Sequence, residues 1–137
     1  MAHSYEDKIA YLNNYRWIML EHARLSNKLY TLVSRLETPK TSNFSNQPRS
    51  TATKTNAFDL DKKDELTREL EIQVRECNVI RKNIETRIKE VESYKHRIVL
   101  EMKYLDLMTY EQIADGLGFD VRHVKRLHKH AVHLFDY

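Results

Sequence analysis

The stretch that decides the fold is RIVLEMKYLDLMTYEQIADGLGFDVRHVKRLHKHAVHLF, residues 97–135. Its apolar side chains recur at steps of three and four residues, which is the spacing of helices that bury one side. Short polar breaks divide the pattern into three runs. The stretch therefore predicts three short helices, at about 94–104, 110–117 and 121–135.

The breaks between these runs carry the residues that begin and end helices. Thr109 and Gln112 match a capping box, in which the hydroxyl and the amide each satisfy a free backbone N–H. Gly118 lies where a helix-ending left-handed residue is needed. Asp120 is of a type that caps the helix after it. Gly116 and Gly118, the two glycines of the chain, both belong to this region.

A turn of about three residues between two short helices, with a third helix before them, is typical of a helix-turn-helix. Ala114 is small at the position where the last helix has to cross the second one closely. We expect residues 94–137 to form this unit, with a core made by Ile113, Leu117, Val124, Leu127, Ala131 and Leu134.

The last predicted helix has an apolar side and a cationic side, and no acid lies between residues 121 and 135. Phosphates attract such cations and release counterions, which predicts double-stranded DNA as the partner. Arg122 and Arg126 are the expected readers of base edges, because arginine binds guanine through two hydrogen bonds. Lys125 and Lys129 are expected on phosphates. The predicted DNA-binding residues are Arg122, His123, Lys125, Arg126, Lys129 and His133.

The remaining histidines of this helix are not expected to bind metal. His130 and His133 have a workable spacing, but no acid or cysteine joins them and their directions on the helix diverge. His128 points near the core, where a hydrogen-bonded boundary residue is the expectation. We predict no metal, no cofactor and no enzymatic activity, since no nucleophile–base pair, phosphate-binding glycine loop or pair of catalytic acids stands out.

Two long segments precede this unit. Residues 1–37 contain no Gly or Pro, and from about Tyr5 onward apolar residues recur at helical spacing. This segment therefore predicts one long helix. Residues 38–58 hold both prolines and many Ser, Thr and Asn, which predicts a flexible polar linker. Residues 59–93 predict a second long helix, begun by Asp59 or Asp61.

The second long helix carries a seam with steps of four and three residues, as in a coiled coil. Its members are Leu70, Val74, Cys77, Arg81, Ile84, Ile88 and Val91. Long helices with one apolar stripe have to pair. The pairing predicts either an antiparallel hairpin within the chain or a dimer between chains. The expected fold class is thus all-α: a long helical hairpin or coiled coil followed by the helix-turn-helix.

Bulk composition limits the function classes. The formal net charge of +3 is too small to prove a nucleic-acid partner by itself, so the position of the charges matters more. Cys77 is the only cysteine, which excludes an intrachain disulfide and fits a reducing compartment. No apolar run approaches the roughly 20 residues that cross a bilayer. We expect a cytoplasmic protein with no membrane partner.

Over residues 97–135 the chain resembles the DNA-binding fourth region of sigma-70-type factors, and more closely the small phage proteins of the ArpU/RinA type. The matching positions are Leu100, Tyr104, Thr109, Glu111, Ile113, Ala114, Leu117, Gly118, Val124, Leu127, His128 and Ala131. Asp120 departs from the serine often found there, and Gly116 from a better helix former. The resemblance implies control of a phage or prophage late operon, in the host bacterial cytoplasm. We expect the long helices to dimerise the protein or to contact RNA polymerase.

Two other functions stay open at the level of sequence. A phage DNA-packaging protein, like a terminase small subunit, would also combine a helix-turn-helix with helical oligomerisation. A protein-interaction adaptor would use the long hairpin and leave the basic helix without sequence preference. Oligomer size and sequence-selective binding distinguish these hypotheses.

Overall fold

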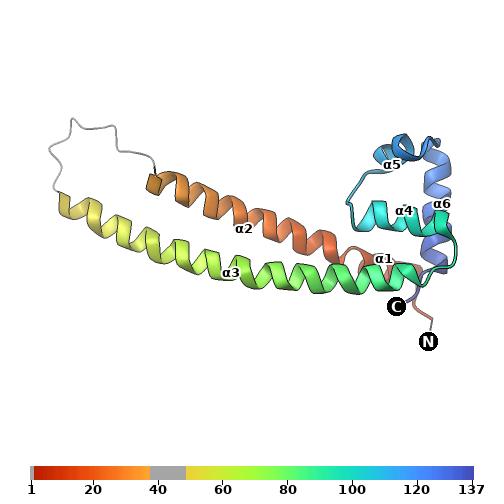
Figure 1. Ribbon diagram of the computed structural model, residues 1–137, viewed down its shortest axis with the longest axis horizontal. Helices are drawn as coiled ribbons and strands as arrows, with labels where there is room; N and C mark the ends of the chain where they lie inside the picture. Colours follow the sequence, from red (N-terminus) through yellow and green to blue (C-terminus); the bar gives the residue numbers. More distant parts are fainter. Residues whose placement is uncertain (1, 38–48) are drawn as a thin grey trace. The chain divides into compact units, whose positions relative to one another are not determined.

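The computed structural model describes the backbone of residues 2–37 and 49–137, and these residues contain helices and connections but no strand. The predicted all-α class is therefore confirmed. The helices within the described residues are α1 (Tyr5–Leu12), α2 (Asn14–Glu37), α3 (Arg49–Lys89), α4 (Tyr94–Tyr104), α5 (Tyr110–Leu117) and α6 (Val121–Leu134) (Figure 1). None of the helices within the described residues has the length and apolar character needed to cross a membrane.

The segment predicted as one N-terminal helix is divided at Asn13. Helical hydrogen bonds continue across the division, since the Asn13 N–H donates to Ile9 at 2.9 Å and the Trp17 N–H donates to Asn13 at 3.1 Å. Ser4 and Asp7 form a capping box that begins α1, a signal that sequence inspection missed. The helix ends at Glu37, just before Thr38-Pro39, as the restriction on a residue preceding proline predicts.

α3 begins at Arg49, well before the predicted start at residue 59. The predicted linker 38–58 is thus corrected: residues 49–58 are helical, and the rest of it, 38–48, lies outside the described residues. Asp59 and Asp61 lie inside the helix and do not cap it. The physical reason is that no Gly or Pro occurs between Pro48 and the end of α3, so nothing stops the helix from extending toward its N-terminus.

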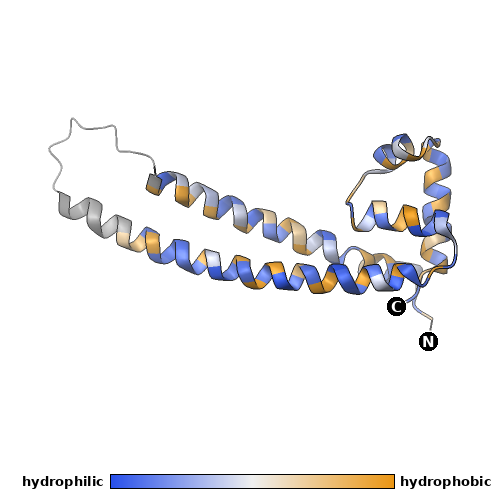
Figure 2. Ribbon diagram, viewed as in Figure 1, coloured by the Kyte–Doolittle hydropathy of each residue, from blue (hydrophilic) through white to orange (hydrophobic). Residues whose placement is uncertain are grey.

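The described chain divides into two units, residues 20–75 and residues 1–19 with 76–137. In the first unit, α2 and α3 pack through a cluster of Leu25, Leu32 and Leu66. His22 Nδ1 lies 3.1 Å from Gln73 Oε1 at the other end of this pairing, so the two helices are antiparallel. Figure 2 shows hydrophobic and hydrophilic residues alternating along both helices, as expected when only one side is buried.

The seam of α3 differs from the prediction in the unit 20–75. Val74 is 43% exposed, whereas its neighbour Gln73 is buried together with Leu66. A shift of one residue turns a helical side chain by about 100°, so the hydrogen bond between His22 and Gln73 places the polar residue inward and the valine outward. Farther along α3, Cys77, Ile84, Ile88 and Val91 are buried as predicted.

The other unit holds the larger core. It joins buried residues of α1, α3, α4 and α6 with Tyr15 of α2; the largest side chains without exposed surface include Leu12, Ile84, Ile88, Leu100 and Phe135. Arg81, the predicted polar interruption of the seam, donates to the Leu105 carbonyl at 3.1 Å, where α4 ends. A cation at a helix C-terminus is favourable because the free carbonyls there carry partial negative charge.

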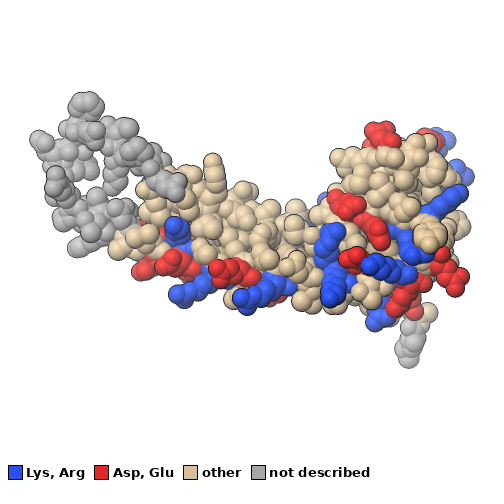
Figure 3. All heavy atoms as spheres, viewed as in Figure 1, with Lys and Arg blue, Asp and Glu red and all other residues tan. Residues whose placement is uncertain are grey.

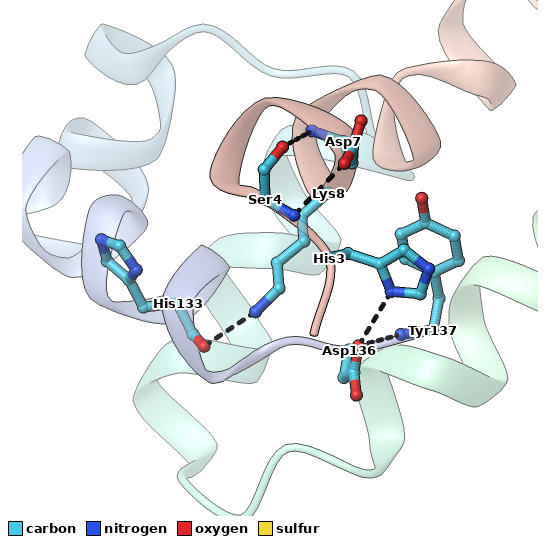
Figure 4. A network of polar contacts seen from close by, with 7 residues as sticks. All are labelled: His3, Ser4, Asp7, Lys8, His133, Asp136 and Tyr137. Carbon is cyan, nitrogen blue, oxygen red and sulfur yellow. Dashed lines mark hydrogen bonds and ion pairs between the residues drawn. The ribbon is translucent and has the colours of Figure 1, made fainter. Parts of the chain in front are cut away.

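The two ends of the chain meet within this unit (Figure 4). The His3 ring stacks on Tyr137 at 3.8 Å, and His3 Nδ1 lies 3.2 Å from the Asp136 carboxylate. Lys8 Nζ donates to the His133 carbonyl at 3.1 Å, which satisfies an acceptor in the last turn of α6. α1 therefore holds the C-terminal end of α6 in place.

The bounds of α4 and α5 agree with the prediction, and α6 ends one residue earlier, at Leu134. The Thr109–Gln112 capping box is present, with bonds of 2.9 and 3.2 Å, and Gly118 has a φ of 70°. Asp120 occupies the capping position of α6, but its side chain makes no cap hydrogen bond. The start of α6 is thus set by the backbone and the preceding glycine.

Where α6 packs on α5, the predicted core residues Ile113 and Val124 are buried and Leu117 is partly buried against them. Ala114, predicted as the small residue at the crossing, is buried with them. The far end of α6 differs: Leu134, a predicted core residue, is 57% exposed, while Val132 and Phe135 are fully buried. The reason is that the buried side of α6 is centred on Val124, His128 and Ala131, and Leu134 lies roughly 90° from that centre. Phe135 follows His128 by seven residues and Ala131 by four, which is the spacing of the buried side.

Candidate nucleic-acid interface

One side of α6 carries a row of basic side chains. Arg122, Arg126, Lys129 and His133 follow one another at steps of four, three and four residues, which places them on one face of a helix. All four are exposed, and the opposite side of α6 is buried through Val124, His128 and Ala131. We call these four residues the cationic row.

The cationic row is free of acids. No ion pair among the described residues involves a Lys or Arg of α6. The long helix α3 behaves differently, because Lys62 and Lys89 each pair with a glutamate of the same helix and Arg87 pairs with Glu90 just after its end. Figure 3 shows the corresponding mixture of acidic and basic side chains along the visible side of α3. The charges of α6 thus remain available to an external anion.

The remaining predicted site residues lie beside the row. His123 is half-buried, with its ring 4.8 Å from that of Phe119. Lys125 is exposed, and its Nζ lies 5.7 Å from the centre of the Tyr110 ring. The His133 ring lies 5.2 Å from Tyr5 of α1, which fixes the end of the row. The predicted residues are therefore brought onto one helix surface, with His123 and Lys125 on opposite flanks.

A buried histidine connects α6 to α4 and α5. His128 is 5% exposed and lies between two tyrosines: Tyr104 Oη is 2.5 Å from Nε2, and Tyr110 Oη is 3.4 Å from Nδ1. Burial, and then the positive charge of Lys103, lowers the pKa of His128 to about 4. His128 is therefore a neutral, hydrogen-bonded residue that orients α6 against α4 and α5, in agreement with the expected boundary role.

The structure adds two basic residues that the sequence pattern did not indicate. Lys103 of α4 places its Nζ 4.3 Å from the centre of the Tyr110 ring, on which Lys125 also converges. Arg16 of α2 is near enough that its charge contributes to lowering the pKa of Lys103. No local signal could have found this group, because its members come from four separate helices.

Metal binding and thiol reactivity lack support among the described residues. Among the described residues, no group of three or more His, Cys, Asp or Glu is arranged to hold a metal ion. Cys77 is buried away from charged partners that would favour a thiolate, and burial raises the pKa of its thiol. What the surface of α6 offers is an array of fixed positive charges and hydrogen-bond donors.

Comparison of the chain with known protein families, with curated proteins and with solved structures finds no match. The surface of α6 and its neighbours is therefore the basis for a functional proposal.

Proposed function

We propose that residues 94–137 form a helix-turn-helix that binds duplex DNA, with α6 in the major groove. The observation that carries the proposal is the cationic row, exposed and without acidic partners among the described residues, on a helix whose other side is buried. The α5–α6 connection supports it, because Gly118 in the left-handed region ends one short helix just before the next begins.

Within this proposal the side chains divide by their place on α6. Arg122, His123 and Arg126 lie in its first half, which is the part of a recognition helix that reaches base edges. Arg122 and Arg126 read bases, and Lys125, Lys129 and His133 contact phosphates. The biological role that we propose is a transcription regulator of phage or prophage late genes, which contacts RNA polymerase or dimerises. The support for that role is the sequence resemblance of residues 97–135.

The test starts with the purified 137-residue chain, which is used to select DNA fragments from the genome that encodes it. The selected fragments are then sequenced. Binding to the selected duplex is then measured by fluorescence anisotropy. We expect Arg126→Ala to weaken binding by about 1–3 kcal/mol and to relax the preference at one base pair. Arg75→Ala, which removes an exposed arginine from the long helix α3, serves as the matched control and should leave the affinity unchanged.

Three results would redirect the proposal. Unchanged affinity when Arg122, Arg126 and Lys129 are all replaced by alanine would reject the cationic row as the reading surface. A ring of many subunits in solution would favour DNA packaging over transcription. Binding that shows no sequence preference and vanishes at moderate salt would favour the protein-interaction adaptor.

A further inference from the structure

A second basic group lies beside the cationic row and is centred on an aromatic ring. Tyr110 begins α5, and its ring has Lys103 Nζ at 4.3 Å and Lys125 Nζ at 5.7 Å from its centre. Its hydroxyl faces His128 Nδ1 at 3.4 Å, which holds the ring in place. Two lysines, one from α4 and one from α6, therefore lie near one ring whose orientation the contact with His128 favours. We call Arg16, Lys103, Tyr110 and Lys125 the Tyr110 cluster.

The charges of this cluster are not neutralised within the described chain. Lys103 is half-buried, and burial followed by the charge of Arg16 lowers its pKa, whereas Glu111 acts in the opposite direction. No ion pair among the described residues joins Lys103 or Arg16 to a carboxylate. A partly buried cation usually has a hydrogen-bonded anionic partner, because desolvation of an unpaired charge is costly. The ring of Tyr110 supplies only part of that compensation.

The cluster adjoins the cationic row on one flank only. Lys125 immediately precedes Arg126 on α6, so the cations continue from the row through Lys125 to Lys103 and Arg16. The other flank carries His123 against Phe119 and His130 near His96, with their rings in contact. The positively charged surface therefore extends from α6 on one flank only, through Lys103 of α4 to Arg16 of α2.

We propose that Arg16, Lys103 and Lys125 form a phosphate anchor that binds the sugar-phosphate backbone of DNA beside the groove occupied by α6. This inference rests on the proposed function, and it adds two residues from outside the predicted helix-turn-helix face. The anchor makes no base contacts, so it raises affinity for all sequences equally and fixes the direction in which the backbone leaves the cationic row. Tyr110 is a positioning residue that holds the two lysines together.

The partner favoured by this geometry is a phosphate backbone and not an acidic peptide. The cations come from α2, α4 and α6: Lys103 and Lys125 lie near the ring of Tyr110, and the charge of Arg16 acts on Lys103. An amphipathic peptide would need a continuous apolar floor to bury its own stripe. A polyanion with regularly spaced charges needs only several neighbouring cations.

The experiment measures binding of the full chain to its selected duplex and to an unrelated duplex by fluorescence anisotropy over a range of salt concentrations. The test variant combines Arg16→Gln with Lys103→Gln. Each lost phosphate contact lowers the slope of log K against log salt by about 1, so we expect a decrease of about 2 and a loss of affinity of roughly tenfold or more on both duplexes. Arg16→Lys with Lys103→Arg keeps the charges and should restore the slope.

Lys95→Gln is the matched control, since Lys95 is an exposed lysine on the same helix as Lys103 but outside the cluster. It should leave slope and affinity unchanged, and circular dichroism should show all variants equally folded. If the wild-type chain binds duplex DNA and the double glutamine variant keeps the same slope, the anchor is wrong while the proposed function stands. If the wild-type chain binds no duplex, both are wrong. Loss of binding to only one duplex would also contradict a sequence-independent anchor.

Discussion

Gly116 and Gly118 are separated by one residue but have opposite requirements. Gly116 lies inside α5 with ordinary helical backbone, and a Cβ added there would meet only the terminal methyl of Met102 at 3.3 Å. Gly118 has a φ of 70°, which disfavours any side chain, although no atom lies within 4 Å of the position where its Cβ would be. Crowding is therefore minor at both positions, and backbone conformation decides the outcome.

We expect the two alanine substitutions to change stability in opposite directions. Gly116→Ala should stabilise the protein by up to about 1 kcal/mol, because alanine is the better helix former and the Met102 methyl can move aside. Gly118→Ala should destabilise it by about 1 kcal/mol, because the left-handed backbone is strained for alanine. Urea denaturation of both variants measures the difference. Equal shifts of the same sign would contradict the assigned backbone conformations.

His128 makes the stability depend on pH. Its folded pKa of about 4 lies below the ordinary value of 6.5, so the unfolded chain binds the proton more readily. The contribution is fully present above pH 6.5 and is lost as the pH falls toward 4. At about 1.4 kcal/mol per pKa unit, the whole effect amounts to about 3 kcal/mol at most.

Two measurements check this expectation. The imidazole of His128 should remain neutral below pH 5 when its ring is followed by NMR. The free energy of unfolding should fall between pH 6.5 and 4.5, and His128→Gln should remove much of that slope while lowering stability at pH 7. A normal titration of His128 near pH 6.5 would show that its ring is not enclosed by Tyr104 and Tyr110.

At the scale of the element, α6 illustrates what periodicity predicts and what it does not. The pattern correctly indicates a helix with a cationic side, and Val124 and Ala131 are buried as expected. It assigns the last core position to Leu134, whereas Leu134 is 57% exposed and Phe135 is fully buried. Leu134 is exposed because it lies roughly 90° from the centre of the buried side, which Val124, His128 and Ala131 define.

Phe135→Ala should therefore destabilise the protein by about 3–5 kcal/mol, because it removes a fully buried aromatic ring and leaves a cavity. Leu134→Ala is the matched control: its side chain is 57% exposed, so we expect a change of well under 1 kcal/mol. Thermal and urea denaturation of the two variants provide the measurement. A larger effect at Leu134 than at Phe135 would contradict the burial of Phe135 and the exposure of Leu134.

The molecule as a whole contains cores of very different size. The unit of residues 20–75 is held by a small leucine cluster and the His22–Gln73 contact, whereas the other unit buries side chains from α1, α3, α4 and α6. Local opening depends on the apolar surface that has to be exposed. The two units should therefore open with different free energies.

Hydrogen exchange followed by mass spectrometry on the full chain should show this difference. We expect the backbone amides of residues 20–36 and 57–75 to exchange faster than those of α4 and α6. Leu32→Ala, which deletes part of the small cluster, should accelerate exchange in residues 20–36 and 57–75 and leave α4 and α6 nearly unchanged. Uniform protection across the described residues would contradict two separately packed units.

The sequence by itself determined the helices of the C-terminal region and the cationic character of α6. Those features depend on signals a few residues apart, such as the Thr109–Gln112 capping box, the left-handed glycine and the absence of acids between residues 121 and 135. Local hydrogen bonding and backbone sterics act over the same short range, so one stretch of chain contains the whole signal.

Only the tertiary structure decided which side chains meet across helices. Gln73 instead of Val74 faces α2 because His22 lies opposite it, and His128 is neutral because Tyr104 and Tyr110 enclose it. The approach of Lys103 and Lys125 to the Tyr110 ring joins residues of α4, α5 and α6. Such contacts depend on how helices pack, and packing reflects the sum of many weak contacts that no single stretch of sequence specifies.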